Sequence, residues 1–178
     1  MRSIVMSPSL LSALACMAFA HAPLAADDQQ GPFYVLGGVS HPDHSATQAV
    51  GSYGFYLGFG YLSGTPGLLQ SGSAGFDIEW RHGSGKGNRL DSYDFCYSER
   101  DFGVAGGLYF GYGVGSTYSQ LRRSGIGESS ASGWRLTAKG ILGYDLGGGV
   151  ALEAAYFISG SMGGVNTSGL TLAAGIWF

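Results

Sequence analysis

Residues 102–121 read FGVAGGLYFGYGVGSTYSQL and contain no charged side chain, so this stretch is long enough to be weighed as a membrane helix. The even positions from Phe102 to Val114 are mostly large and apolar, whereas the odd positions from Gly103 to Gly115 are mostly glycine. A helix would spread the even positions around its circumference, but a strand places them on one face. Glycine also disfavours a helix by about 1 kcal/mol per residue. The alternation therefore predicts a strand over residues 102–115.

Seven other segments alternate in the same way between large apolar residues and small or polar ones. They are residues 33–40, 53–61, 71–82, 89–98, 134–144, 150–158 and 170–178. The connections at 41–50, 83–88, 116–131 and 160–167 fall on one side of the sheet, and those at 63–70, 99–101 and 146–148 fall on the other. We predict an all-β fold, an eight-stranded antiparallel up-and-down barrel with its longer connections at one end.

The composition indicates where this barrel resides. Charged residues make up 12% of the 178 residues and hydrophobic residues 45%, whereas a soluble domain usually has about 25% charged residues. An outer surface so poor in charge suits lipid, so we predict a transmembrane barrel. A soluble barrel of the lipocalin type would turn its large apolar residues inward around a ligand. The net charge of -3 excludes a basic surface for nucleic acid.

The first segment has the pattern of an export signal. Arg2 precedes an apolar stretch over residues 4–20, and the small residues Ala25 and Ala26 stand before a polar run. We predict a cleaved signal peptide over residues 1–26 and a single barrel domain over 27–178; cleavage after Ala20 also satisfies the small-residue rule. Removal of Cys16 with the signal would leave Cys96 as the only thiol, so no disulfide would stabilise the mature chain.

Charged residues on the less apolar face of the strands are expected to point into the lumen. Eight strands enclose a space that side chains can fill, and charges there are tolerated only when paired. We therefore predict an internal ion-pair network and no wide pore. Its members are Asp77, Glu79, Arg81, Asp94, Arg135, Lys139 and Glu153. By the same alternation Cys96 should point inward. Aromatic residues near strand ends, including Tyr34, Trp80, Trp134 and Trp177, are expected to form girdles at the membrane surfaces.

The final strand, residues 170–178 with the sequence LTLAAGIWF, carries a family resemblance together with the export signal and the eight strands. The chain resembles the small eight-stranded outer-membrane barrels of Gram-negative bacteria, the OmpA/OmpX type. The resemblance implies a monomer in the cell outer membrane with its loops facing outside. It also implies a signal for the barrel-assembly machinery, formed here by Leu172, Ala174, Ile176 and Phe178. It implies little about activity, because this barrel serves adhesins, anchors, conduits and lipid A-modifying enzymes.

Two clusters contain residue types that can carry chemistry. Lipid A 3-O-deacylases of this shape use a His-x-Ser pair before the last loop, but residues 155–159 contain no histidine. His82 and Ser84 have that spacing at the outer end of the third strand, where Asp91 is placed to orient His82; we expect an ordinary polar edge there and no enzyme. His41, Asp43 and His44 offer at most three metal ligands beside Pro42, so we predict no metal site and no cofactor.

Arg122 and Arg123 fall in the longest predicted outer loop, over residues 116–131. Guanidinium groups bind phosphate in a bidentate way, so this pair is a candidate contact for lipopolysaccharide. The leading functional prediction is a noncatalytic surface protein whose barrel is an anchor and whose loops contact lipopolysaccharide or an external partner. The alternatives are a narrow conduit for small solutes and a lipid A-modifying hydrolase at His82 and Ser84.

Overall fold

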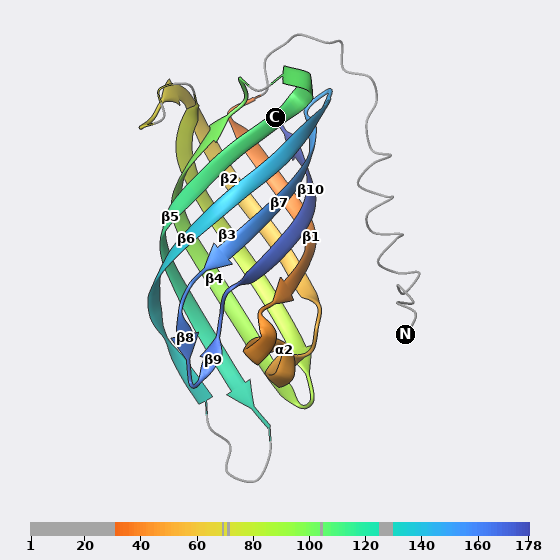
Figure 1. Cartoon of the computed structure of the whole chain (residues 1–178), viewed down its shortest axis with the longest axis vertical. Helices are drawn as coiled ribbons and strands as arrows, with labels where there is room; N and C mark the ends of the chain where they lie inside the picture. The colour runs from red at the N-terminus through yellow and green to blue at the C-terminus, as the bar shows by residue number, and fades with distance from the viewer. Residues whose placement is uncertain (1–30, 69, 71, 104, 125–129) are drawn as a thin grey trace.

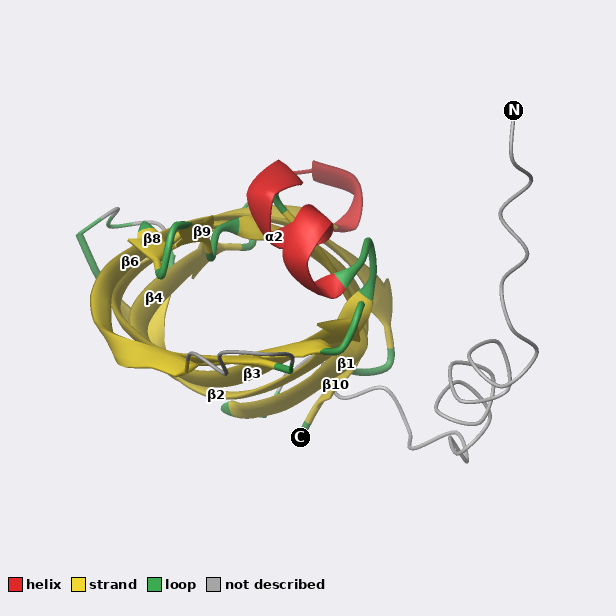
Figure 2. Cartoon of the chain, turned by 90° about the horizontal axis from the view of Figure 1, so that it is seen from below, coloured by secondary structure: helices red, strands yellow, loops and turns green. Residues whose placement is uncertain are grey.

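Eight long strands form a closed antiparallel barrel in the computed structural model, which describes residues 31–178 except 69, 71, 104 and 125–129 (Figure 1). They are β1 (Phe33–Pro42), β2 (Gly54–Pro66), β3 (Ser73–Gly85), β4 (Asn88–Asp101), β5 (Leu108–Arg123), β6 (Ser130–Gly147), β7 (Val150–Ile158) and β10 (Gly169–Trp177). Each pairs with its neighbours in the chain, and β1 pairs with β10 to close the ring (Figure 2). The predicted eight-stranded antiparallel barrel is confirmed.

Four short elements lie in the connections. The helix α2 (His44–Val50) follows β1, the 3₁₀ turn η1 (Ala105–Gly107) precedes β5, and β8 (Ser161–Met162) pairs with β9 (Val165–Asn166). Helix α2 and the β8–β9 hairpin lie at the end of the barrel opposite Phe178 (Figure 1). We call these two ends the α2 end and the C-terminal end. Among the described residues, no helix is long and apolar enough to cross a membrane.

The predicted bounds of the fifth strand were wrong at both ends. The connection before β5 contains η1, where Gly106 and Gly107 have φ of 79° and 83°, values that favour glycine. Strand β5 instead begins at Leu108 and runs to Arg123, and β6 begins at Ser130. Most of the loop predicted over 116–131 is therefore strand.

The α2 end also differs from the prediction in its connections. The β3–β4 connection is the two-residue turn Lys86-Gly87, with φ of 51° and 77°, which is the geometry favoured in tight hairpins. The predicted loop at 41–50 contains α2, and that at 160–167 contains the β8–β9 hairpin. The contrast in loop length between the two ends is accordingly smaller than the sequence suggested.

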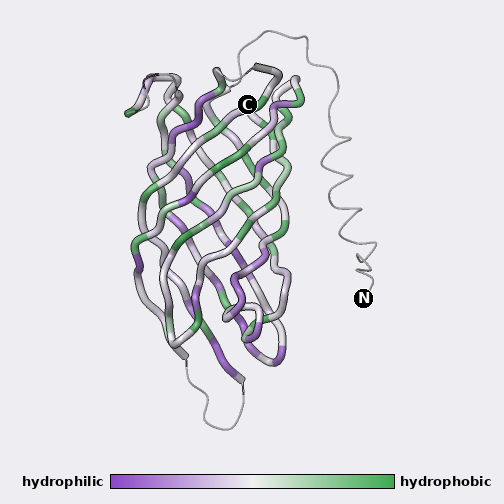
Figure 3. The backbone as a smooth tube through the Cα atoms, viewed as in Figure 1, coloured by the Kyte–Doolittle hydropathy of each residue, from purple (hydrophilic) through white to green (hydrophobic). Residues whose placement is uncertain are grey.

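The two faces of the wall have opposite chemistry. Large apolar side chains such as Phe76, which is 65% exposed, point outward, and polar side chains point into the lumen. Figure 3 shows hydrophobic and hydrophilic residues alternating along the strands. The lipocalin-type arrangement is thereby excluded. Two of the aromatic residues expected in the girdles, Tyr34 and Trp177, are instead buried in the lumen, because they fall on the inward parity of β1 and β10.

Two inward glycines leave room for lumen rings. A Cβ atom added at Gly60 would lie 2.0 Å from the Tyr34 ring, and one at Gly143 would lie 1.9 Å from the Tyr109 ring. Both distances are shorter than any real contact, so these rings require glycine on the facing strand.

Candidate functional site

The middle of the lumen holds a cluster of charged side chains from β3, β4, β6 and β7. Lys139 donates to Glu79 at 2.9 Å and also to Asp77. Arg100 donates through Nε to Glu153 at 3.1 Å and contacts Asp77 at 3.5 Å. All five residues are buried. Cations and anions thus alternate through the cluster, which is the arrangement that makes buried charge tolerable.

Tyrosine hydroxyl groups complete the coordination of these carboxylates. Tyr56 donates to Glu79 at 2.5 Å, Tyr109 donates to Glu153 at 3.2 Å, and Tyr34 donates to Asp77. The Arg100 guanidinium also lies 4.5 Å from the centre of the Tyr34 ring. Each of these carboxylates therefore accepts a phenol hydroxyl in addition to its cationic partner.

A second ion pair lies closer to the α2 end. Arg81 donates to both oxygens of Asp94, at 3.0 Å each, and Thr117 donates to the same carboxylate. Arg81 further donates to the Thr167 carbonyl at 3.1 Å and packs 4.2 Å from the centre of the Phe157 ring. This bidentate pair links β3 and β4 to the segment that precedes β10.

Both ends of the lumen are filled. At the C-terminal end the rings of Tyr34, Phe102, Tyr109 and Trp177 pack together, with the Tyr34 and Trp177 centroids 4.5 Å apart. At the α2 end a buried apolar cluster covers the lumen, formed by Ala46, Val50, Leu90, Leu121, Met162 and Val165. A cavity of about 30 Å³ remains between Val50 and Arg81, which is room for about one water molecule. The arrangement is a packed core.

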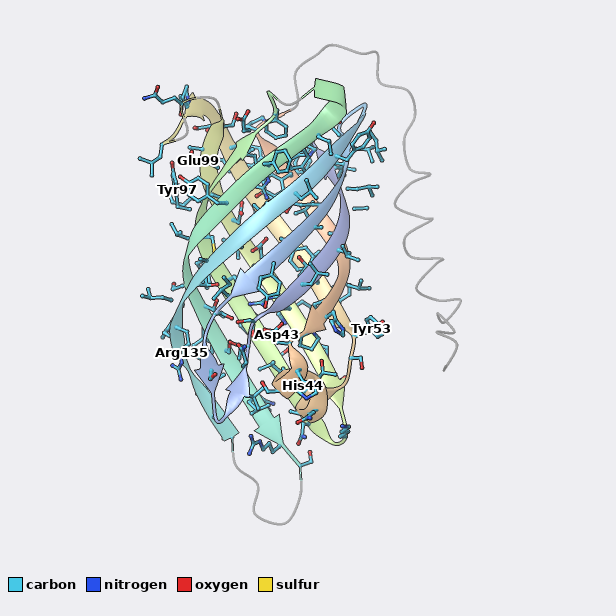
Figure 4. All side chains as sticks on the ribbon, in the orientation of Figure 1. Asp43, His44, Tyr53, Tyr97, Glu99 and Arg135 are labelled. Carbon is cyan, nitrogen blue, oxygen red and sulfur yellow. The ribbon has the colours of Figure 1, made fainter. Side chains whose placement is uncertain are left out.

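The structure places six of the seven predicted lumen residues in these two groups, but Arg135 lies elsewhere. Arg135 is at the α2 end, where it donates to the Ser161 carbonyl at 3.1 Å and to the Trp134 carbonyl (Figure 4). The β6–β7 ladder begins only at Ala138, so Arg135 lies on the part of β6 that pairs with β5 alone, opposite Thr117. The prediction missed Arg100, which was assigned to a turn. Continuing the β4 alternation past Ser98 would have found it.

The outer wall near the α2 end carries three successive rows of side chains in cross-strand register on β3, β4, β5 and β6. The first, which we call the aromatic row, consists of Trp80, Tyr93, Tyr118 and Trp134. The next row toward the α2 end consists of His82, Asp91, Gln120 and Ser132. The third, which we call the arginine row, consists of Ser84, Arg89, Arg122 and Ser130.

Asp91 is the centre of contacts between these rows. It is only 3% exposed and accepts from His82 Nδ1 at 2.8 Å, from Arg89 Nε at 2.6 Å and from Trp80 Nε1 at 3.3 Å. Asp91 therefore orients His82, as the sequence suggested. Ser84 is exposed on the same face of β3, yet no hydrogen bond joins it to His82 within the described residues. The His–Asp half of a triad is present without an engaged nucleophile.

Arg122 and Arg123 lie on β5 and not at a loop tip. Arg122 faces outward and donates to the Gln120 side chain at 3.1 Å. Arg123 has the opposite parity and donates to the Gly163 carbonyl at 2.8 Å, in the β8–β9 connection. The two side chains therefore do not act as one pair.

The possible metal ligands of the first connection are turned toward different partners. His41 contacts the Ser52 carbonyl, Asp43 accepts from Tyr156 at 3.0 Å, and His44 contacts Gln48 at 2.9 Å. In the part of the chain that the structure describes, no three His, Cys, Asp or Glu residues form a group able to hold a metal ion.

The remaining predicted residues fall as follows. Cys96 is a free, buried cysteine on the inward face of β4. Leu172, Ala174 and Ile176 share the outward face of β10, and Phe178 follows it with its ring stacked 6.2 Å from Phe33. Residues 1–26, predicted to be a signal peptide, lie outside the described residues.

Comparison with known proteins places the fold among small membrane barrels. Neisserial surface protein A (NspA) superposes with a TM-score of 0.52 at 18% identity, over 83% of this chain and 98% of that one. The Yersinia pestis outer membrane protein Ail, determined in a phospholipid bilayer nanodisc, gives a TM-score of 0.53 at 15% identity, over 83% of this chain and 99% of that one. No protein-family model and no curated protein matches the sequence. At these identities the likeness establishes the shared eight-stranded barrel.

Proposed function

We propose that this chain is a noncatalytic integral protein of the outer membrane, whose barrel is a rigid anchor and whose α2 end contacts lipopolysaccharide or an external partner. The observation that carries the proposal is the inversion of the wall, with apolar side chains outside and an ion-paired, sealed core inside. An apolar exterior of this kind is stable in lipid, and a sealed lumen leaves only the barrel ends for interaction.

Two aromatic belts support the proposed position in the membrane. The aromatic row marks one boundary, and its Trp134 is 57% exposed. At the C-terminal end, Phe33 contacts both Tyr61 and Phe178 on the outer surface, with ring centroids 5.2 and 6.2 Å apart. Rings of this kind lie at the two water–lipid boundaries of membrane barrels. We infer that the α2 end faces outside, because α2, the β8–β9 hairpin, the end of β5 and the start of β6 all project there (Figure 1).

The same proposal includes the route of assembly. The outward residues Leu172, Ala174, Ile176 and Phe178 are available to the barrel-assembly machinery before the ring closes, and residues 1–26 would direct export. One chain closes its own sheet, which suits a monomer.

The first test combines fractionation with heat modification. Outer-membrane material is run on a denaturing gel without heating and after boiling, because a closed barrel resists the detergent until it is heated. We expect the protein in the outer-membrane fraction with a heat-dependent change in mobility. A soluble periplasmic protein without such a change would overturn the proposal.

Orientation is tested by cysteine labelling on intact cells. In a Cys96→Ser background, Lys86→Cys places a thiol in the β3–β4 turn at the α2 end, and Leu146→Cys places one near the β6–β7 turn at the C-terminal end. An impermeant maleimide should label the first and not the second until the cells are opened. The reverse pattern would show that the α2 end faces the periplasm.

The conduit alternative has a direct electrical test. The packed side-chain clusters at the two ends of the lumen support a non-conducting barrel. We expect no unitary conductance in a planar bilayer. Channels whose conductance changes in Lys139→Met would instead place conduction in the lumen.

A hydrolase is the second candidate function, favoured by one observation. His82 contacts Asp91 through Nδ1, so its other ring nitrogen, Nε2, is the one that could act as a base toward Ser84, which lies on the same face of β3. The test is the mass spectrum of lipid A from cells with the protein, without it, and with Ser84→Ala. Loss of an acyl chain that requires Ser84 would favour the hydrolase, and identical spectra would favour the anchor.

A further inference from the structure

Two arginines face each other across the β4–β5 ladder in the arginine row. Arg89 and Arg122 are directly opposite, both point away from the lumen, and both are exposed, with half of the Arg89 side chain open to its surroundings. Residues in such a pair have Cβ atoms about 4.5–5.5 Å apart, and like charges at this separation are destabilising. The placement therefore favours an anion between the two guanidinium groups.

The described neighbours supply only part of the compensating charge. Asp91 accepts from Arg89 at 2.6 Å, but the same carboxylate also accepts from His82 and Trp80. Arg122 has a neutral partner, the Gln120 amide oxygen at 3.1 Å. Of the two guanidinium groups, only Arg89 has a carboxylate partner among the described residues, and that carboxylate also accepts from two other side chains. Excess positive charge therefore remains at the Arg122 side of the pair.

The position of the arginine row along the membrane normal indicates which anion lies beside it. Arg89 lies four residues beyond Tyr93 and Arg122 four residues beyond Tyr118, both toward the α2 end. At about 3.3 Å per residue and a tilt of about 40°, this distance corresponds to about 10 Å along the membrane normal. Since the aromatic row marks the boundary of the hydrocarbon, the arginine row lies among the headgroups of the outer leaflet.

We propose that the arginine row binds a phosphate group of lipopolysaccharide, with Arg89 and Arg122 bridging its oxygens and the Ser84 and Ser130 hydroxyl groups flanking them. Planar guanidinium forks match phosphate in this bidentate way, and the serines stand directly beside the arginines in the register. The assignment rests on the proposed function, because it requires this wall to lie in the outer leaflet. It excludes Arg123, which faces the β8–β9 connection.

The test measures binding of purified, heat-modifiable barrel in detergent to lipopolysaccharide, to the same lipopolysaccharide with its lipid A phosphates removed, and to inorganic phosphate. The variant is Arg122→Gln, and the matched control is Arg123→Gln on the adjacent residue. Removing one charge-assisted contact should weaken binding of the phosphorylated lipid by about tenfold. The control should bind within about twofold of the unmodified protein, the usual range for a surface change that touches no ligand. Neither variant should change binding of the dephosphorylated lipid.

Each outcome has a distinct meaning. Equal losses in the two variants, or losses that persist with dephosphorylated lipid, would overturn the assignment. Equally tight binding of inorganic phosphate would show a site for the free anion and not for a lipid. The proposed function is judged separately by heat modification and fractionation of the unmodified protein: if those succeed while Arg122→Gln binds normally, only the phosphate site fails.

Discussion

Replacing Lys139 with methionine tests whether charge pairing holds the lumen together. Methionine keeps an unbranched chain of similar length but removes the cation between Glu79 and Asp77. Asp77 retains Arg100, whereas Glu79 retains, among the described residues, the Tyr56 hydroxyl alone. Removing one partner of a buried pair costs about 3–5 kcal/mol, because the other charge is left uncompensated. We expect a loss of about 3 kcal/mol in the free energy of unfolding.

The assay is reversible urea unfolding in lipid vesicles, followed by tryptophan fluorescence. Lys86→Met is the matched control, because the only other lysine is exposed in the β3–β4 turn and would lose only a solvent-exposed hydrogen bond to the Gln48 carbonyl; a surface change of this kind should fall within about 0.5 kcal/mol of the unmodified protein. The double variant Lys139→Met, Glu79→Gln removes the stranded charge, so it should recover about 1 kcal/mol or more. A loss below about 1 kcal/mol for Lys139→Met, or a double variant no more stable than the single one, would refute the reasoning.

Three further predictions concern packing, assembly and exposure. Gly143→Ala should lower the free energy of unfolding by about 1–3 kcal/mol, because the new methyl group meets the Tyr109 ring, whereas Gly140→Ala on the same strand meets no atom within 4 Å and should be nearly neutral. Deleting Phe178 should reduce the yield of heat-modifiable barrel formed by purified assembly machinery much more than the yield of spontaneous refolding into detergent; equal yields by both routes would argue against its role as a signal. The buried Cys96 thiol should react with maleimide only after boiling, so labelling of the unheated barrel would show that the lumen opens.

Alternation was sufficient to find all eight strands, but it does not mark where a strand ends. Residues 102–107 keep the apolar parity of β5, yet Gly106 and Gly107 adopt positive φ and turn the chain before Leu108. Residues 116–121 look like a loop because they are mostly polar, although Thr117 and Ser119 point into the lumen and continue the strand. Beyond the lipid boundary the barrel wall no longer needs apolar residues, so residue composition there does not distinguish a strand from a loop.

The prediction of the candidate sites from the sequence was incomplete for a related reason. Parity in the sequence predicts which face of the wall a side chain occupies, whereas its height depends on the shear between strands. Arg135 and Lys139 share a parity, but only Lys139 lies at the level of Asp77 and Glu79. The opposition of Arg89 and Arg122 likewise depends on the β4–β5 register, which follows from a hairpin whose turn was assigned wrongly. The adjacency of Arg122 and Arg123 in the sequence therefore does not identify the pair of arginines that face each other. The β4–β5 ladder, which places Arg89 opposite Arg122, identifies it.

The ladder between β1 and β10 constrains the order in which the molecule can form. It joins Tyr34 to Trp177 and Pro42 to Gly169, so the contacts that complete the ring connect the two most distant parts of the barrel sequence. Contacts of such high sequence separation form slowly, because a long loop must be closed first. Until β10 arrives, β1 and β7 each present an unpaired edge, and Tyr34 lacks the Trp177 ring that packs against it. We therefore expect a chain with seven paired strands to expose two edges that can pair with other chains, until β10 docks and closes the ring.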